Sequence, residues 1–196
     1  MKFRLYIAFL ISLSLYTYAD SWAPAEPLGS ISPDGDIIVR ITPGDSLGDT
    51  WGFAGAKTGE YATATYYKFR KNGGYSKFQE IKLRNPIAPL FAAVSNDGTL
   101  VTLDNWHNMG IGNALTLYKP DGSHQQSFPL EHFYSKEQIS KFDSSVSSLW
   151  WRCGIPQLHP RTSELHIDDQ LGGTLAVNIY DGSYRYESDA GRCAQP

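Results

Sequence analysis

Short runs of apolar and β-branched residues alternate with turn sequences along most of the chain. The strand-like runs 37–41 and 100–103 each follow a turn that contains Asp-Gly, within residues 31–35 and 94–98. Asp-Gly and Asn-Gly tolerate the positive φ that tight hairpins require. The hydrophobic pattern therefore predicts antiparallel strands connected by hairpins.

The same register recurs a third time in residues 158–167, where the Asp-Gly pair has been lost. Each copy then continues through a further strand-like run to a second turn, at residues 72–74, 121–122 and 181–182. Each copy thus predicts four strands joined by a turn, a loop and a turn. We expect an all-β fold of three four-stranded antiparallel meanders, with repeats at about residues 28–85, 88–130 and 149–190.

The second copy carries a family resemblance. Its segments 94–104, 113–118 and 121–122 resemble the blades of secreted β-propellers of the YVTN/NHL type, which implies propeller-like sheets over most of the chain. Familiar closed propellers have at least about four blades, whereas this chain supplies one fewer. Three arrangements are open: an irregular element within residues 131–152, a ring completed by two chains as a homodimer, or an open stack of blades.

The insert at residues 131–148 differs from the repeats. Residues 131–142 predict one short helix, with Ser135 as the N-cap and Gln138 three residues later. The β-prone run 149–153 follows, and we expect it to begin the third sheet.

The first 19 residues have the pattern of a signal peptide rather than of structure. They combine a basic start, an apolar stretch and small residues before the expected cleavage point: Lys2, Arg4, residues 5–15, Thr17 and Ala19. The apolar stretch is too short to span a bilayer comfortably. We therefore expect cleavage after Ala19, a single domain over residues 20–196, and a secreted or periplasmic protein without a membrane anchor.

The chain contains only two cysteines, Cys153 and Cys193. Disulfides persist in the oxidising compartments that an exported protein enters. Neither cysteine has the C-x-x-C spacing of a redox or metal site. We expect one structural disulfide between them.

Composition narrows the fold and the partners. Hydrophobic residues make up 41% of the 196 residues and aromatic residues 13%, which excludes intrinsic disorder. The 18 Gly and 11 Pro argue against a helical bundle. A formal charge of −3 leaves no basic field to neutralise phosphates, so no nucleic-acid partner is expected.

The meander topology predicts where a site would form. Because successive strands reverse direction, the loop between strands two and three of each copy lies at the same end as the link to the next sheet. Long loops on a rigid sheet scaffold are frequent positions for binding and catalysis. The residues expected to gather at this end are Asp45, Asp49, Trp51, Asp104, Trp106, His107, His132, Arg152, Asp168 and Asp169.

These residue types suggest binding rather than catalysis. Indole rings offer platforms for a sugar or a peptide, and carboxylates can ligate Ca²⁺. Asp104 and Asp168 are the metal candidates, although aspartates at strand ends are also common turn formers. The predicted ligand-binding residues are Asp49, Trp51, Asp104, Trp106, His107, Asp168 and Asp169.

Residues 44–50 contain Gly-Asp-Ser-Leu and resemble the nucleophile block of GDSL-type esterases. The resemblance implies Ser46 as nucleophile, His159 as base and the Gly48 amide as an oxyanion donor. Pro156 stands where that family has an aspartate, and the residues between the motifs alternate like strands.

We expect a non-enzymatic exported binding module without a cofactor, its partner being an unknown small molecule, sugar or protein. The alternatives are a secreted esterase acting through Ser46, and a propeller-type hydrolase or lactonase that holds Ca²⁺ at Asp104 and Asp168.

Overall fold

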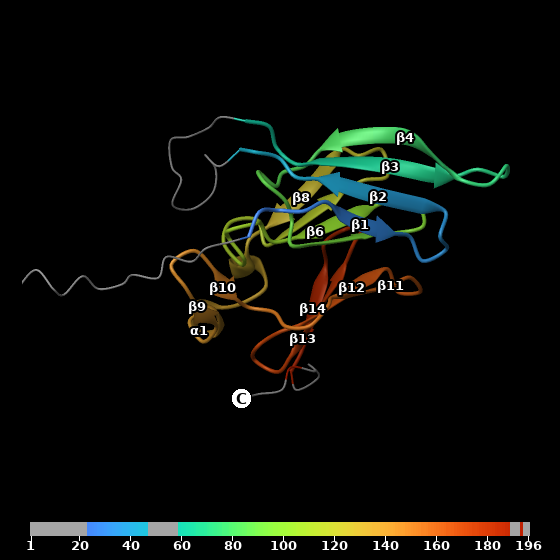
Figure 1. Ribbon diagram of the computed structural model, residues 1–196. Coiled ribbons are helices and arrows are strands. Elements are labelled where there is room, and N and C mark those ends of the chain that lie inside the picture. The colour runs from blue at the N-terminus through green and yellow to red at the C-terminus, as the bar shows by residue number, and fades with distance from the viewer. Residues whose placement is uncertain (1–22, 47–58, 189–192, 194–196) are drawn as a thin grey trace, which may run out of the picture.

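The computed structural model describes residues 23–46, 59–188 and 193. This part of the chain is mostly β-structure in antiparallel sheets (Figure 1). The predicted signal peptide, together with Asp49 and Trp51, lies outside the described residues.

Three sheets have four strands each and are simple meanders, which confirms the predicted repeat. The first sheet contains β1 (Leu28–Ile31), β2 (Ile37–Thr42), β3 (Thr63–Phe69) and β4 (Tyr75–Lys82). The second contains β5 (Phe91–Val94), β6 (Leu100–Leu103), β7 (Leu115–Tyr118) and β8 (His124–Phe128). The third contains β11 (Gln157–His159), β12 (Glu164–Asp168), β13 (Thr174–Asn178) and β14 (Tyr184–Glu187).

The sheets stack in chain order, with the second sheet buried on both faces. One of its faces packs against the first sheet through Ala92, Val94, Leu100 and Tyr118. The other packs against the third sheet through Ala93, Val101, Leu103, Leu115 and Leu117. We call the face of a sheet that is turned toward the next sheet along the chain its forward face, and the opposite face its backward face. The backward face of the first sheet and the forward face of the third therefore have no neighbouring sheet among the described residues.

The first hairpin turn of each sheet needs one residue with positive φ. Gly35 and Gly98 adopt it in the first and second sheets, at 77° and 96°. In the third sheet, where the Asp-Gly pair is lost, Ser163 takes the left-handed conformation with φ 57°. The third turn thus keeps a residue with positive φ although its glycine is absent.

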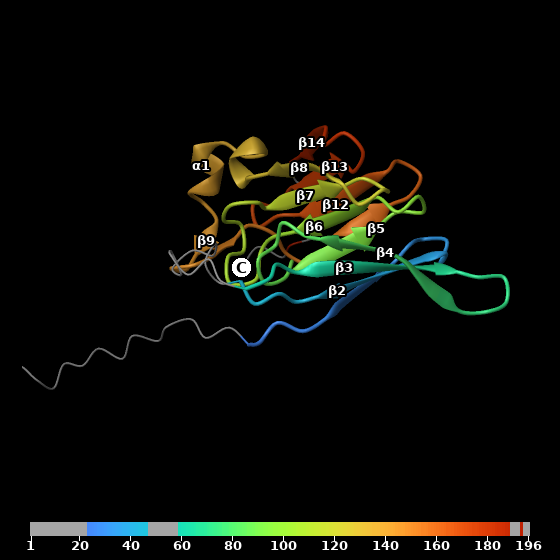
Figure 2. The same cartoon turned by 90° about the horizontal axis from the view of Figure 1, so that it is seen from above.

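The insert between the second and third sheets contains the expected helix. A 3-10 turn (η1, Leu130–His132) precedes α1 (Lys136–Ile139), and Ser135 and Gln138 form the predicted capping box. In Figures 1 and 2 the insert lies at the end of the sheets opposite to the tip of the β3–β4 hairpin. No helix in the described part of the chain has the length and apolar character needed to cross a membrane.

The prediction for residues 149–153 was wrong in its pairing. β10 (Leu149–Trp150) pairs with β9 (Asp143–Ser144) in a two-stranded hairpin, and the third sheet begins only at Gln157. The Leu149 amide donates to the Met109 carbonyl at 2.8 Å, and Trp151 is fully buried. These contacts draw the segment toward the loop after β6 rather than into the third sheet.

Candidate functional site

Loops and linking segments of the second and third sheets lie together at one end of these sheets. We call this region the loop end; it comprises residues 104–113 between β6 and β7, residues 169–173 between β12 and β13, and the linking residues 83–90 and 149–153. An isolated bridge joins Arg152 to Asp169, and the Gln170 amide donates to the Trp151 carbonyl at 3.1 Å. Backbone contacts therefore hold the two loops and the linking segment together.

Asp104 is the centre of the loop end. Its side chain is fully buried, and its Oδ1 accepts from the Gly110 amide at 2.9 Å and from the Trp151 indole at 2.8 Å. Its Oδ2 accepts from Arg152 Nε at 2.8 Å. The Asp104 carbonyl also accepts from Asn85 Nδ2 at 2.8 Å. A buried carboxylate requires such compensation. Together these bonds connect the linking residues 83–90 and 149–153 and the loop's own Gly110 to Asp104.

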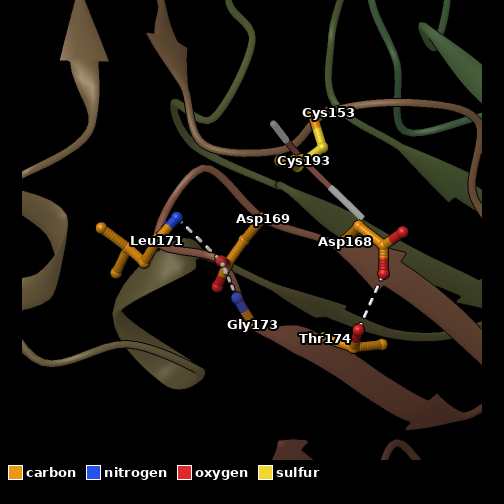
Figure 3. The surroundings of a disulfide bond; sticks show 7 residues. All are labelled: Cys153, Asp168, Asp169, Leu171, Gly173, Thr174 and Cys193. Carbon is orange, nitrogen blue, oxygen red and sulfur yellow. Dashed lines mark hydrogen bonds between the residues drawn. A yellow bond between two sulfur atoms is a disulfide. The ribbon is translucent and has the colours of Figure 1, made fainter. Parts of the chain in front are cut away.

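Asp169 is a second buried carboxylate, and it stabilises its own loop. Its Oδ1 accepts from the amides of Leu171 and Gly173, both at 2.9 Å (Figure 3). Its Oδ2 and the Tyr134 hydroxyl are both buried without a hydrogen-bond partner among the described residues. Burial, followed by the nearby Asp169 charge, raises the pKa of Tyr134. The tyrosine therefore stays neutral beside the carboxylate.

Asp168 is turned away from Asp169, because successive residues of a strand point to opposite faces. Its Oδ1 accepts from the Thr174 hydroxyl at 2.7 Å on the forward face of the third sheet (Figure 3). Asp104, by contrast, is enclosed beside Trp151, with N–H donors on both carboxylate oxygens. The structure does not bring the two predicted calcium ligands together. Across the described residues, no group of three or more His, Cys, Asp or Glu side chains is arranged to hold a metal ion.

The accessible part of the loop end carries Trp106 and His107, which are both half-buried. The Trp106 indole donates to the Ala23 carbonyl at 3.0 Å, and its amide donates to the Ala88 carbonyl at 2.8 Å. Burial lowers the pKa of His107, so its imidazole is neutral near pH 7. An indole and a neutral imidazole at consecutive positions of the loop are suited to contacts with an uncharged ligand.

The backbone of this loop is strained at two places. Asp104 has φ 58° and His107 has φ 72°, and the one other described non-glycine residue with positive φ is Ser163. Such conformations persist only where the surroundings enforce them. Here the hydrogen bonds of Asp104 and the bridge between Asn105 and Asn108, which closes the turn around His107, supply that enforcement.

Two members of the predicted set are not part of the Asp104 cluster. The His132 ring packs against Phe128 and Tyr184, with centroids 4.7 and 5.3 Å apart. Asp45 accepts from the Glu60 amide at 2.6 Å, beside the first sheet. Neither contacts the Asp104 cluster.

The two residues of the esterase alternative are not brought together. Ser46 is buried after β2, where its amide donates to the Glu60 carbonyl at 3.3 Å. His159 ends β11, and its ring lies 4.1 Å from that of His166. Leu47 and Gly48 lie outside the described residues.

The cysteine pair is formed as expected. Cys153 and Cys193 make a disulfide with their Cα atoms 6.0 Å apart. The Cys153 amide donates to the Asp168 carbonyl at 2.9 Å, so the disulfide lies beside the end of β12 (Figure 3).

Sequence reasoning missed Trp151 and Asn85 as parts of the site. Adjacent tryptophans in an extended segment point to opposite sides, and Trp150 is 41% exposed whereas Trp151 is 0% exposed. That rule could have predicted one buried indole, but not its partner Asp104. Asn85 carried no signal, since its role depends on contacts with residues in another sheet.

Comparison with known proteins adds no assignment. The sequence matches no protein-family model, and no curated protein is significantly similar to it.

Proposed function

We propose that the protein is an exported binding module that holds its ligand at the loop end, on the surface around Trp106 and His107. The observation that carries this proposal is the strained loop 104–113, fixed by the buried Asp104 network. Strained backbone that the surroundings over-determine is concentrated at functional sites. A preformed loop also lowers the conformational entropy that a ligand must remove on binding.

The chemistry of the surface favours a sugar or a peptide. An indole plane packs against the apolar face of either, and the edges of the ligand can hydrogen-bond to loop backbone groups. Export is supported by the basic, apolar and small-residue pattern of residues 1–19 and by the disulfide.

Isothermal titration of the mature chain with a panel of neutral oligosaccharides and short peptides tests the proposal. We expect Trp106→Ala to weaken binding of the responding probe at least about tenfold, which corresponds to about 1.4 kcal/mol. Tyr75→Ala is the control, because Tyr75 is an exposed aromatic residue in the β3–β4 hairpin, whose tip lies at the opposite end of the sheets (Figure 1). Equal losses in both variants, or no binding of either probe class, would contradict the proposal.

The same preparations test the esterase alternative. Hydrolysis of a short-chain p-nitrophenyl ester by the wild type that disappears in Ser46→Ala would replace the binding module with a hydrolase. We expect both proteins to be equally inactive, because Ser46 follows β2 of the first sheet whereas His159 ends β11 of the third.

A further inference from the structure

The second and third sheets each contact the preceding sheet through equivalent positions on their backward faces. The first sheet has no preceding sheet among the described residues, so its equivalent positions have no such contact. The registers place Ile31 opposite Ile38, Val94 opposite Leu100, and Leu158 opposite Leu165, next to the first turn of each sheet. These pairs all lie on backward faces. Sheets one and two also share a bulge at the same place, after Tyr66 in β3 and after Leu117 in β7.

Equivalent positions differ sharply in exposure. Ile31 is 58% exposed, whereas its equivalent Val94 is 1% exposed. Leu100 and Leu165 are fully buried, whereas their equivalent Ile38 is only half-buried. The backward face of the first sheet therefore leaves accessible apolar residues whose equivalents in the other sheets are buried against a preceding sheet.

The second turn of each sheet follows the same pattern of contacts with the preceding sheet. A Cβ at Gly122 would collide with Gln79 and Ile81 of β4, and one at Gly182 would collide with Phe128 of β8. The glycine turn of the second sheet thus packs against the last strand of the first, and that of the third sheet packs against the last strand of the second. At Gly73, the corresponding turn of the first sheet, a Cβ would meet nothing within 4 Å.

Among the described residues, the forward face of the third sheet is the one sheet face left without a following sheet, and so the one that could pack on the backward face of the first sheet by the same rule. It is polar and mostly acidic, whereas the backward face of the first sheet carries more basic than acidic groups. On the third sheet these groups are Glu164, Asp168, Glu187 and Arg185, and on the first sheet Arg40, Lys77, Lys82 and Glu80. Opposite charges across an interface steer association and fix its register.

We propose that two copies of this chain form a closed ring, in which the first sheet of each copy packs its backward face on the forward face of the third sheet of the other. Two identical contacts then cover every open sheet face. Three sheets alone fall below the roughly four to eight blades of closed propellers, whereas the sheets of two copies fall within that range. A head-to-tail contact that closes after two copies gives a discrete dimer and not a filament. The proposal is independent of the ligand at the loop end.

Sedimentation equilibrium and native mass spectrometry of the mature chain test the ring. We expect a mass twice that of one chain at micromolar concentration. Ile31→Asp should raise the dimer dissociation constant at least about tenfold, with an unchanged circular dichroism spectrum. Val146→Asp is the control, because Val146 is 88% exposed in the insert, away from both faces.

A second pair of variants identifies the face that meets the first sheet. Glu187→Lys on the third sheet should weaken the dimer as well, whereas Glu137→Lys on exposed α1 should not. A dimer that Ile31→Asp breaks but Glu187→Lys leaves intact would show pairing between two first sheets and would overturn the ring. A folded monomer at all concentrations, or an open series of larger oligomers, would overturn it equally.

Discussion

Asp104 illustrates how one buried side chain organises a surface loop. Its carboxylate receives N–H groups from Gly110, Trp151 and Arg152, which come from two separate segments. The Arg152 side chain is only 10% exposed, so its charge depends on Asp104 for compensation. Removing one member of a buried pair leaves the other charge desolvated and unpaired.

Asp104→Asn should therefore lower the free energy of unfolding by about 3 kcal/mol. Urea denaturation at pH 7 measures the change. Asp121→Asn is the matched control, because the exposed Asp121 caps its turn through Oδ1, which an asparagine retains; we expect a change within about 0.5 kcal/mol. Similar losses in both variants would mean that the Asp104 network contributes no more than a surface turn.

His107 should make stability sensitive to mild acid. Burial lowers its pKa from 6.5, so the unfolded chain binds a proton at a pH where the folded chain does not. Stability is then complete above about pH 6.5 and falls as the pH drops toward the folded pKa.

Urea denaturation at pH 7.5 and pH 5.5 tests whether the free energy of unfolding falls at the lower pH. We expect the wild type to lose more stability between the two values than His107→Asn, because asparagine does not titrate and tolerates the left-handed conformation. Identical pH dependence of the two proteins would show that His107 is not the titrating group.

Among the elements, the hairpin turns show that a positive φ can be kept where glycine has been replaced. Ser163 stands in the left-handed conformation that Gly98 adopts in the second sheet. That conformation costs an ordinary L-residue about 1 to 2 kcal/mol. A glycine would avoid this cost, but it would also increase the conformational entropy of the unfolded chain, which removes part of the gain.

Ser163→Gly should raise the free energy of unfolding by about 0.5 to 1 kcal/mol. Thr162→Gly, one residue earlier in the same turn, is the control and should destabilise the protein, because its φ is not positive. The two urea transitions should shift in opposite directions; a shift of both toward instability would contradict the strain at Ser163.

For the molecule as a whole, the disulfide joins the end of the chain to the segment that enters the third sheet. It closes a separation of 40 residues, which corresponds to about 4 kcal/mol in the chain-entropy account. The Cys153 amide also bonds to Asp168, so the cross-link lies next to the loop end.

Reduction with dithiothreitol should therefore lower the melting temperature and the urea midpoint of the wild type. A variant with Cys153→Ser and Cys193→Ser should have the melting temperature and urea midpoint of the reduced protein, and dithiothreitol should not change them. A wild type whose midpoint does not move on complete reduction would contradict the expected stabilisation.

The sequence by itself determined the features that depend on local chemistry. The strand alternation, the Asp-Gly turns and the repeat predicted three meanders, and Ser135 with Gln138 predicted the helix cap. The strand alternation, the turns and the cap each depend on residues a few positions apart. The cysteine pair was equally clear, since the chain offers no alternative partner.

Only the tertiary structure decided which of the predicted site residues meet. Asp168 and Asp169 look alike in sequence, yet strand register turns one outward and buries the other. The segment 149–153 did not join the third sheet because Asp104 accepts from the Trp151 indole and the Met109 carbonyl accepts from the Leu149 amide, and both acceptors are distant in the chain. Ser46 and His159 were separated by the stacking order of the sheets. Such outcomes depend on contacts between segments far apart in sequence, which no local pattern encodes.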